Sequence, residues 1–147
     1  MGLHFADIFF RLLPEAYLMI YFIFMLSKKN LSLIRFLISG IVIALLVYIV
    51  RLLPIYFGIH MVINLVLYIS IVNINGISLV KSICNSLIAM ITLSICEIIN
   101  FLLLNIFNIN YYDNEYIIKS MLGIPSLLIF ILIIVLIKIY IKNKGQK

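Results

Sequence analysis

The chain has 147 residues, of which 66% are hydrophobic and 11% are charged, and its mean hydropathy is +1.30. A soluble domain of this length needs far more polar surface, so the composition excludes one and favours a membrane protein. The net charge of +6 does not indicate nucleic-acid binding, because the basic residues flank apolar segments, where they act as topology signals and contact anionic lipid.

Five apolar segments follow one another along the chain. Their apolar runs are continuous, which favours helices over the alternating pattern of a membrane barrel. We predict membrane-spanning helices at 8–26, 34–53, 54–73, 78–106 and 117–140. Since the connectors are short, we expect one all-α transmembrane domain over residues 1–147, with a short basic cytoplasmic tail at 138–147.

The first segment is the weakest of the five, because Arg11, Pro14 and Glu15 interrupt it. Asp7, Arg11 and Glu15 fall at i+4 steps, which places Arg11 within reach of either acid. A four-span arrangement would leave this segment re-entrant or interfacial. It lacks the basic start and the small-residue cleavage site of a signal peptide, so we expect it to be retained.

The second and third segments differ in character. The second is almost entirely Ile, Leu and Val in its central part, so we expect it to face lipid. In the third, i+4 spacing forms a continuous polar stripe on one helix face, made of Tyr56, His60, Asn64 and Tyr68.

The fourth segment has polar residues near one face, at Ser86, Ser94, Glu97, Asn100 and Asn105. Cys84 and Cys96 lie on the same segment, about 18 Å apart along a helix, so they cannot pair within it. They also lack metal-ligand spacing. In the fifth segment, Pro125 frees a backbone carbonyl and predicts a kink.

Basic residues divide unequally between the two sides of these segments. One side holds eight, namely Lys28, Lys29, Arg35, Lys81, Lys138, Lys142, Lys144 and Lys147. The other holds three, namely Arg11, Arg51 and Lys119. The positive-inside rule therefore predicts an external N-terminus and a cytoplasmic C-terminus. Abundant Ile, Asn and Lys indicate an AT-rich genome, so we expect the plasma membrane of a low-GC bacterium.

Ionisable residues in three segments share one depth. On this topology they lie about six to nine residues below the outer surface, or roughly 9–14 Å. A charge at the centre of a membrane helix costs about 2.5–3.5 kcal/mol on insertion scales, so it needs a partner or a role. We predict an outward-facing pocket lined by Glu15, His60, Asn64, Glu97 and Asn100, with Arg11 and Arg51 as countercharges. A structural network of interhelical hydrogen bonds is the alternative.

The sequence contains no catalytic constellation, and we expect no cofactor and no metal. Cys84 and His60 lie toward opposite ends of their segments, so they cannot form a nucleophile–base dyad. Metalloprotease and phosphate-binding motifs are missing. We therefore predict a non-enzymatic membrane module. A small proton-coupled transporter or substrate-binding membrane subunit, with Glu15 as the proton site, is the main alternative, and a structural assembly factor is the third.

A few short motifs carry a resemblance: Arg11-Leu-Leu-Pro14-Glu15, Arg51-Leu-Leu-Pro54 with His60, Glu97, and Gly123-Ile-Pro125. Together with the hydropathy pattern, which covers most of the chain, they resemble the N-terminal membrane sensor portion of clostridial accessory-gene-regulator-like receptor histidine kinases. The resemblance implies a module that perceives a small peptide or a lipid signal from outside. It would act through a membrane or cytoplasmic signalling partner, alone or as an oligomer. After Lys138 only the basic tail follows, so the chain would not phosphorylate its partner itself.

Overall fold

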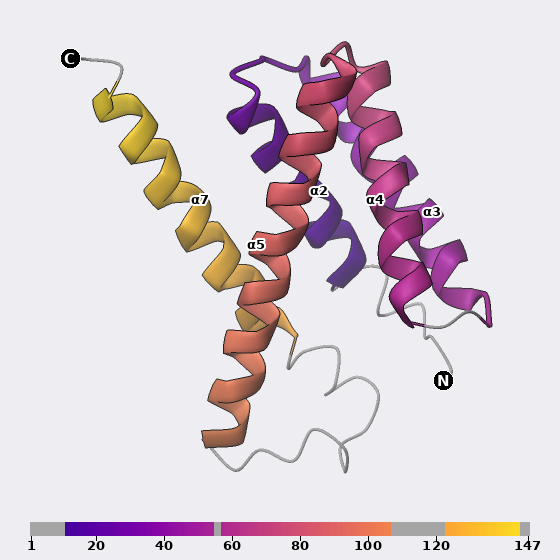
Figure 1. The fold of residues 1–147 in the computed structure, drawn as a ribbon, viewed down its shortest axis with the longest axis vertical. Helices are drawn as coiled ribbons and strands as arrows, with labels where there is room; N and C mark the ends of the chain where they lie inside the picture. Colours follow the sequence, from indigo (N-terminus) through magenta and orange to yellow (C-terminus); the bar gives the residue numbers. More distant parts are fainter. Residues whose placement is uncertain (1–10, 55–56, 107–122, 145–147) are drawn as a thin grey trace.

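The computed structural model describes residues 11–54, 57–106 and 123–144, and every regular element among them is helical. The helices are α2 (Leu13–Leu26), α3 (Leu33–Leu52), α4 (Phe57–Ile74), α5 (Leu79–Ile106) and α7 (Ile124–Lys144). Successive helices alternate in direction, as Figure 1 shows. The predicted all-α class is therefore confirmed for the described part of the chain.

Three of the described helices are long and apolar enough to cross a membrane: α3, α5 and the stretch Ile124–Asn143 of α7. Helices α2 and α4 are apolar but shorter. A helix rises 1.5 Å per residue, so α2 spans about 21 Å, less than the roughly 30 Å hydrocarbon core. Arg11 and Leu12 precede α2 in π-helical geometry and add to its length.

Helix α2, the weakest segment by sequence, is the centre of the bundle. It contacts α3, α4, α5 and α7. Its buried residues cover a broad part of its circumference and comprise Ala16, Met19, Ile20, Phe22, Ile23 and Phe24. Phe22 meets Phe130 of α7 edge to face, with ring centroids 5.5 Å apart. Tyr21 is the one exposed residue of α2, so the neighbours of this helix are mainly protein.

Helix α3 has two different faces. Its outer face is exposed, as the sequence predicted for a lipid-facing segment. Its other face packs against α2, and there Gly40 allows a close approach. A Cβ atom at Gly40 would overlap the ring of Tyr17, whose hydroxyl donates a hydrogen bond to the Leu37 carbonyl at 3.1 Å. One side of α3 is therefore exposed, as a lipid-facing helix requires, and the other is covered by protein.

Helix α2 ends in a Schellman motif. The Lys28 amide donates to the Met25 carbonyl at 3.1 Å, and the Lys29 amide donates to the Phe24 carbonyl at 3.2 Å. Lys28 occupies the left-handed position of this motif with φ 51°. Glycine is the usual residue there, because a Cβ in this conformation costs about 1–2 kcal/mol. The connector to α3 therefore starts from a strained lysine.

The start and end of α7 differ from the sequence expectation. Pro125 is the second residue of the described helix, where its missing N–H breaks no hydrogen bond, so it does not produce the kink that we predicted. Ser126 donates a hydrogen bond to the Gly123 carbonyl at 2.6 Å and stabilises this first turn. The helix continues to Lys144, so most of the predicted basic tail, 138–147, is helical.

The alternating helices separate the described basic residues into two groups (Figure 1). We call one end of the bundle the lysine end, with Lys28, Lys29, Arg35, Lys81, Lys138 and Lys142. We call the opposite end the arginine end, with Arg11 and Arg51. Helices α5 and α7 lie together near the arginine end and separate toward the lysine end (Figure 1).

Candidate functional site

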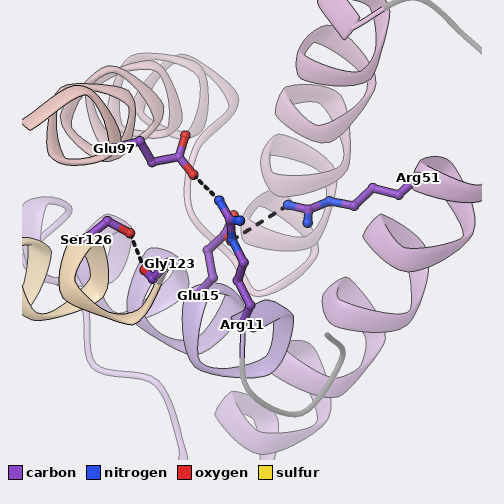
Figure 2. Close-up of polar contacts among 6 residues, drawn as sticks. All are labelled: Arg11, Glu15, Arg51, Glu97, Gly123 and Ser126. Carbon is purple, nitrogen blue, oxygen red and sulfur yellow. Dashed lines mark hydrogen bonds and ion pairs between the residues drawn. The ribbon is translucent and has the colours of Figure 1, made fainter. Parts of the chain in front are cut away.

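Two ion pairs connect three helices at the arginine end (Figure 2). Arg11 Nη2 lies 2.9 Å from Glu97 Oε1 of α5 and donates a hydrogen bond to it. Arg51 Nη2 of α3 lies 3.8 Å from Glu15 Oε2 of α2. We call these residues the four-charge cluster. Its two positive and two negative groups balance, which lowers the cost of placing them in an apolar bundle.

The pairing differs from the i+4 pattern of the sequence. Arg11 bonds Glu97, which is 86 residues away on another helix, and Glu15 has Arg51 as its partner. Asp7, the other acid predicted within reach of Arg11, lies outside the described residues. Arg11 and Arg51, the predicted countercharges, each form an ion pair with a carboxylate on another helix.

The two carboxylates are enclosed to different extents. The Glu15 side chain is 13% exposed and the Glu97 side chain is 43% exposed. Within the described protein, Glu15 is the acid that protein surrounds, because it lies on the central helix.

A small cavity adjoins the Arg11–Glu97 pair. Its volume is about 170 Å³, and its polar wall comprises Arg11, Glu97, Asn100 and Ser126. Typical ligand pockets measure roughly 300–1,000 Å³, so this space does not enclose a peptide. Its size suits a few water molecules or a small polar ligand, since a water molecule takes about 30 Å³.

The predicted pocket residues are divided between different places. Glu97 and Asn100 line the small cavity, while Glu15 lies in the adjoining ion pair. His60 and Asn64 of α4 do not line this cavity. Their Nδ1 and Oδ1 atoms are buried and have no hydrogen-bond partner among the described residues. Tyr56, the first residue of the polar stripe, lies outside those residues.

Polar contacts also occur at the lysine end. Asn75 donates to Ser39 at 2.9 Å and links the end of α4 to α3. Asn85 of α5 donates to Ser27 at 2.7 Å, beside the end of α2. Neither asparagine was among the predicted site residues, although an asparagine in an apolar helix, such as Asn85, is a signal for such contacts.

A larger cavity, of about 670 Å³, opens at the lysine end. The α2–α3 connector and the first turn of α3 form most of its wall, and Lys138 of α7 closes one side. Lys138 donates a hydrogen bond to the Tyr21 hydroxyl at 3.1 Å. None of these residues belonged to the predicted pocket, because their positions in the sequence identified the lysines as topology signals only.

Comparisons of the chain with protein-family models, with curated proteins and with solved structures gave no match. Within residues 11–54, 57–106 and 123–144, no three His, Cys, Asp or Glu side chains come together as a metal site would require. The fold defines a class, a helical protein whose apolar helices are compatible with a membrane.

Proposed function

We propose that this chain is a multi-pass protein of a bacterial plasma membrane, with five transmembrane helices and the lysine end in the cytoplasm. The positive-inside rule supports this orientation. The short helix α2 is compatible with it, because four other helices shield α2 from lipid. Low-GC bacterial origin rests on the amino-acid usage alone.

Within that membrane, we propose a non-enzymatic, sensor-like or accessory module that acts through a partner protein. The four-charge cluster is the observation that carries this proposal. It places two carboxylates and two guanidinium groups where ionised groups are costly, and it connects α2 to both α3 and α5. An external signal that displaces one guanidinium would change the contacts of α2 with its neighbours.

The small cavity limits what the signal can be. A volume of about 170 Å³ beside Glu97 favours a small polar ligand or a change in hydration. A peptide or a lipid, the ligands implied by the sequence resemblance, would act at the mouth of this cavity rather than inside the bundle.

A small transporter is the second candidate, and one observation favours it. Transporters need polar groups toward both faces of the membrane, and this bundle has the four-charge cluster at one end and the Asn75–Ser39 and Asn85–Ser27 bonds at the other. Glu15, on the central helix, would be the proton-binding group.

The test uses the full chain in two preparations. Protein purified from native membranes in mild detergent should retain a kinase or an ATPase in stoichiometric amount. The same protein, reconstituted alone in liposomes, should catalyse no proton-coupled flux. Flux by the isolated protein that Glu15→Gln abolishes would establish the transporter instead.

A variant pair then tests the cluster. Glu97→Gln should leave insertion and the partner complex intact while the partner no longer responds to the external medium. Ile98→Leu is the matched control, because the adjacent Ile98 is 60% exposed and lies outside the cluster. A partner activity that neither Glu97→Gln nor His60→Gln alters, at normal protein levels, would leave only a structural role for these residues.

A further inference from the structure

We propose that the cavity at the lysine end is a binding site for one anionic phospholipid. Its volume of about 670 Å³ falls in the range of small-molecule pockets. Lys28, Lys29 and Lys138 bring three ammonium groups to it, and Phe24 and Phe36 supply an apolar wall. The site joins two parts of the chain that are more than a hundred residues apart, the α2–α3 connector and α7.

The charges around the cavity indicate that the lipid headgroup is anionic. The acids of the described chain are Glu15 and Glu97, and both pair with arginines at the opposite end of the bundle. The three lysines therefore face the cavity without a carboxylate from the described residues. Such a concentration of positive charge attracts an anion.

The apolar wall of the cavity indicates that the ligand also has acyl chains. Phe24, Phe36 and Leu33 border the same cavity, and Leu33 is 74% exposed. A free phosphate would contact the lysines alone and leave this wall uncovered. An anionic lipid satisfies both walls, because its headgroup meets the ammonium groups while its acyl chains cover the apolar side chains.

Lys28 is the central cation of the site. Lys29 bonds the Gly76 carbonyl, and Lys138 bonds Tyr21 and lies 5.8 Å from the centre of its ring. The Lys28 side chain forms no hydrogen bond or ion pair within the described residues. Its left-handed backbone is also strained, and strain retained at one residue is a common mark of a functional position.

The experiment measures lipid binding to the purified full-length protein by native mass spectrometry in detergent. Phosphatidylglycerol and phosphatidylcholine with identical acyl chains are the two probes. We expect one phosphatidylglycerol molecule per protein to bind more tightly than phosphatidylcholine. Lys28→Gly and Lys138→Gln should each weaken that preference about fivefold, as expected for one lysine at an anionic surface.

Two sets of variants distinguish a defined site from diffuse attraction by the lysine end. Lys28→Gly relieves the left-handed strain, so the protein should melt at a higher temperature while it binds less lipid. Lys81→Gln and Lys142→Gln remove the same charge from the same end without touching the cavity, and they should leave the preference unchanged. Equal weakening by all four substitutions would mean diffuse attraction and overturn the proposal.

Two further results would also overturn it. One is equal binding of phosphatidylglycerol and phosphatidylcholine. The other is displacement of phosphatidylglycerol by inorganic phosphate at a comparable concentration, which would mean that the site recognises a soluble anion.

Discussion

At the scale of single residues, the Arg11–Glu97 pair is the most direct contact of the four-charge cluster. Arg11→Gln and Glu97→Gln should each destabilise the bundle, because each removes one charge of the 2.9 Å ion pair. The double variant should cost less than the sum of the two, with a coupling free energy of about 1 kcal/mol. Thermal unfolding of all four proteins in one detergent measures this coupling. Additive effects would show that the pair contributes nothing beyond its separate charges.

The Arg51–Glu15 pair and the Arg11–Glu97 pair should differ in how much the loss of the arginine lowers the melting temperature. Arg51→Gln leaves the Glu15 carboxylate, which is 13% exposed, whereas Arg11→Gln leaves the Glu97 carboxylate, which is 43% exposed. An enclosed charge without a partner costs more than an accessible one, so Arg51→Gln should lower the melting temperature further. The addition of Glu15→Gln should restore part of that loss. The reverse order would mean that the contact at 3.8 Å is too long to matter.

Only part of the site could be predicted from the sequence. Glu97 and Asn100 were expected to line one pocket, because they lie near one face of the same helix, and they do share a cavity wall. The partner of Arg11 could not be predicted, since helix spacing reports only on neighbours along the same helix. Glu97 becomes that partner through the packing of α2 against α5, which depends on the shapes of many side chains.

At the scale of helices, Gly40 and Gly58 offer a matched comparison. Gly40→Ala would place a methyl group inside the space of the Tyr17 ring and should cost about 1–3 kcal/mol, despite the better helix propensity of alanine. Gly58→Ala meets nothing within 4 Å and should be neutral or stabilise by up to about 1 kcal/mol. Unfolding in detergent measures both.

A third variant checks the cause of the Gly40 effect. In a Tyr17→Ala background the ring is gone, so Gly40→Ala should cost little. If Gly40→Ala remains as damaging there, the close packing of α2 on α3 is not the reason for the effect.

Helix positions followed closely from the apolar runs. The predicted 34–53 and 78–106 correspond to α3 (Leu33–Leu52) and α5 (Leu79–Ile106). Proline was harder to interpret, because its effect depends on its place in the helix. At Pro125 it occupies the first turn of the described helix and is harmless there. The central position of α2 could not be predicted from the sequence, because an apolar helix can be surrounded either by lipid or by protein.

For the whole molecule, the testable property is orientation. With Cys84 and Cys96 replaced by serine or alanine, Ser78→Cys should react with an impermeant thiol reagent only from the cytoplasmic side. Leu53→Cys should react only from outside. Both positions are exposed and lie at opposite ends of the bundle. Labelling of both from one side would refute the alternating topology, and labelling with the sides exchanged would refute the orientation.

The cavity at the lysine end could not be predicted from the sequence, because its lysines come from distant parts of the chain. Lys28 and Lys29 appeared in a connector, and Lys138 appeared near the predicted tail, more than a hundred residues later. Each was explained by the positive-inside rule, which needs no contact between them. Their meeting around one cavity depends on the path of α7 past the end of α2.

Because α7 diverges from α5 toward the lysine end, a small rotation where the two helices meet moves the far end of α7 by a larger distance (Figure 1). Helix α7 has 21 residues and touches α5 near the arginine end. A pivot of about 10° there would move the far end of a helix about 31 Å long by roughly 5 Å, or one helical turn. The hydrogen bond from Lys138 to Tyr21 is the restraint on that swing nearest the free end in the described chain. A small displacement beside Glu97 would therefore produce a larger displacement at the lysine end of the bundle.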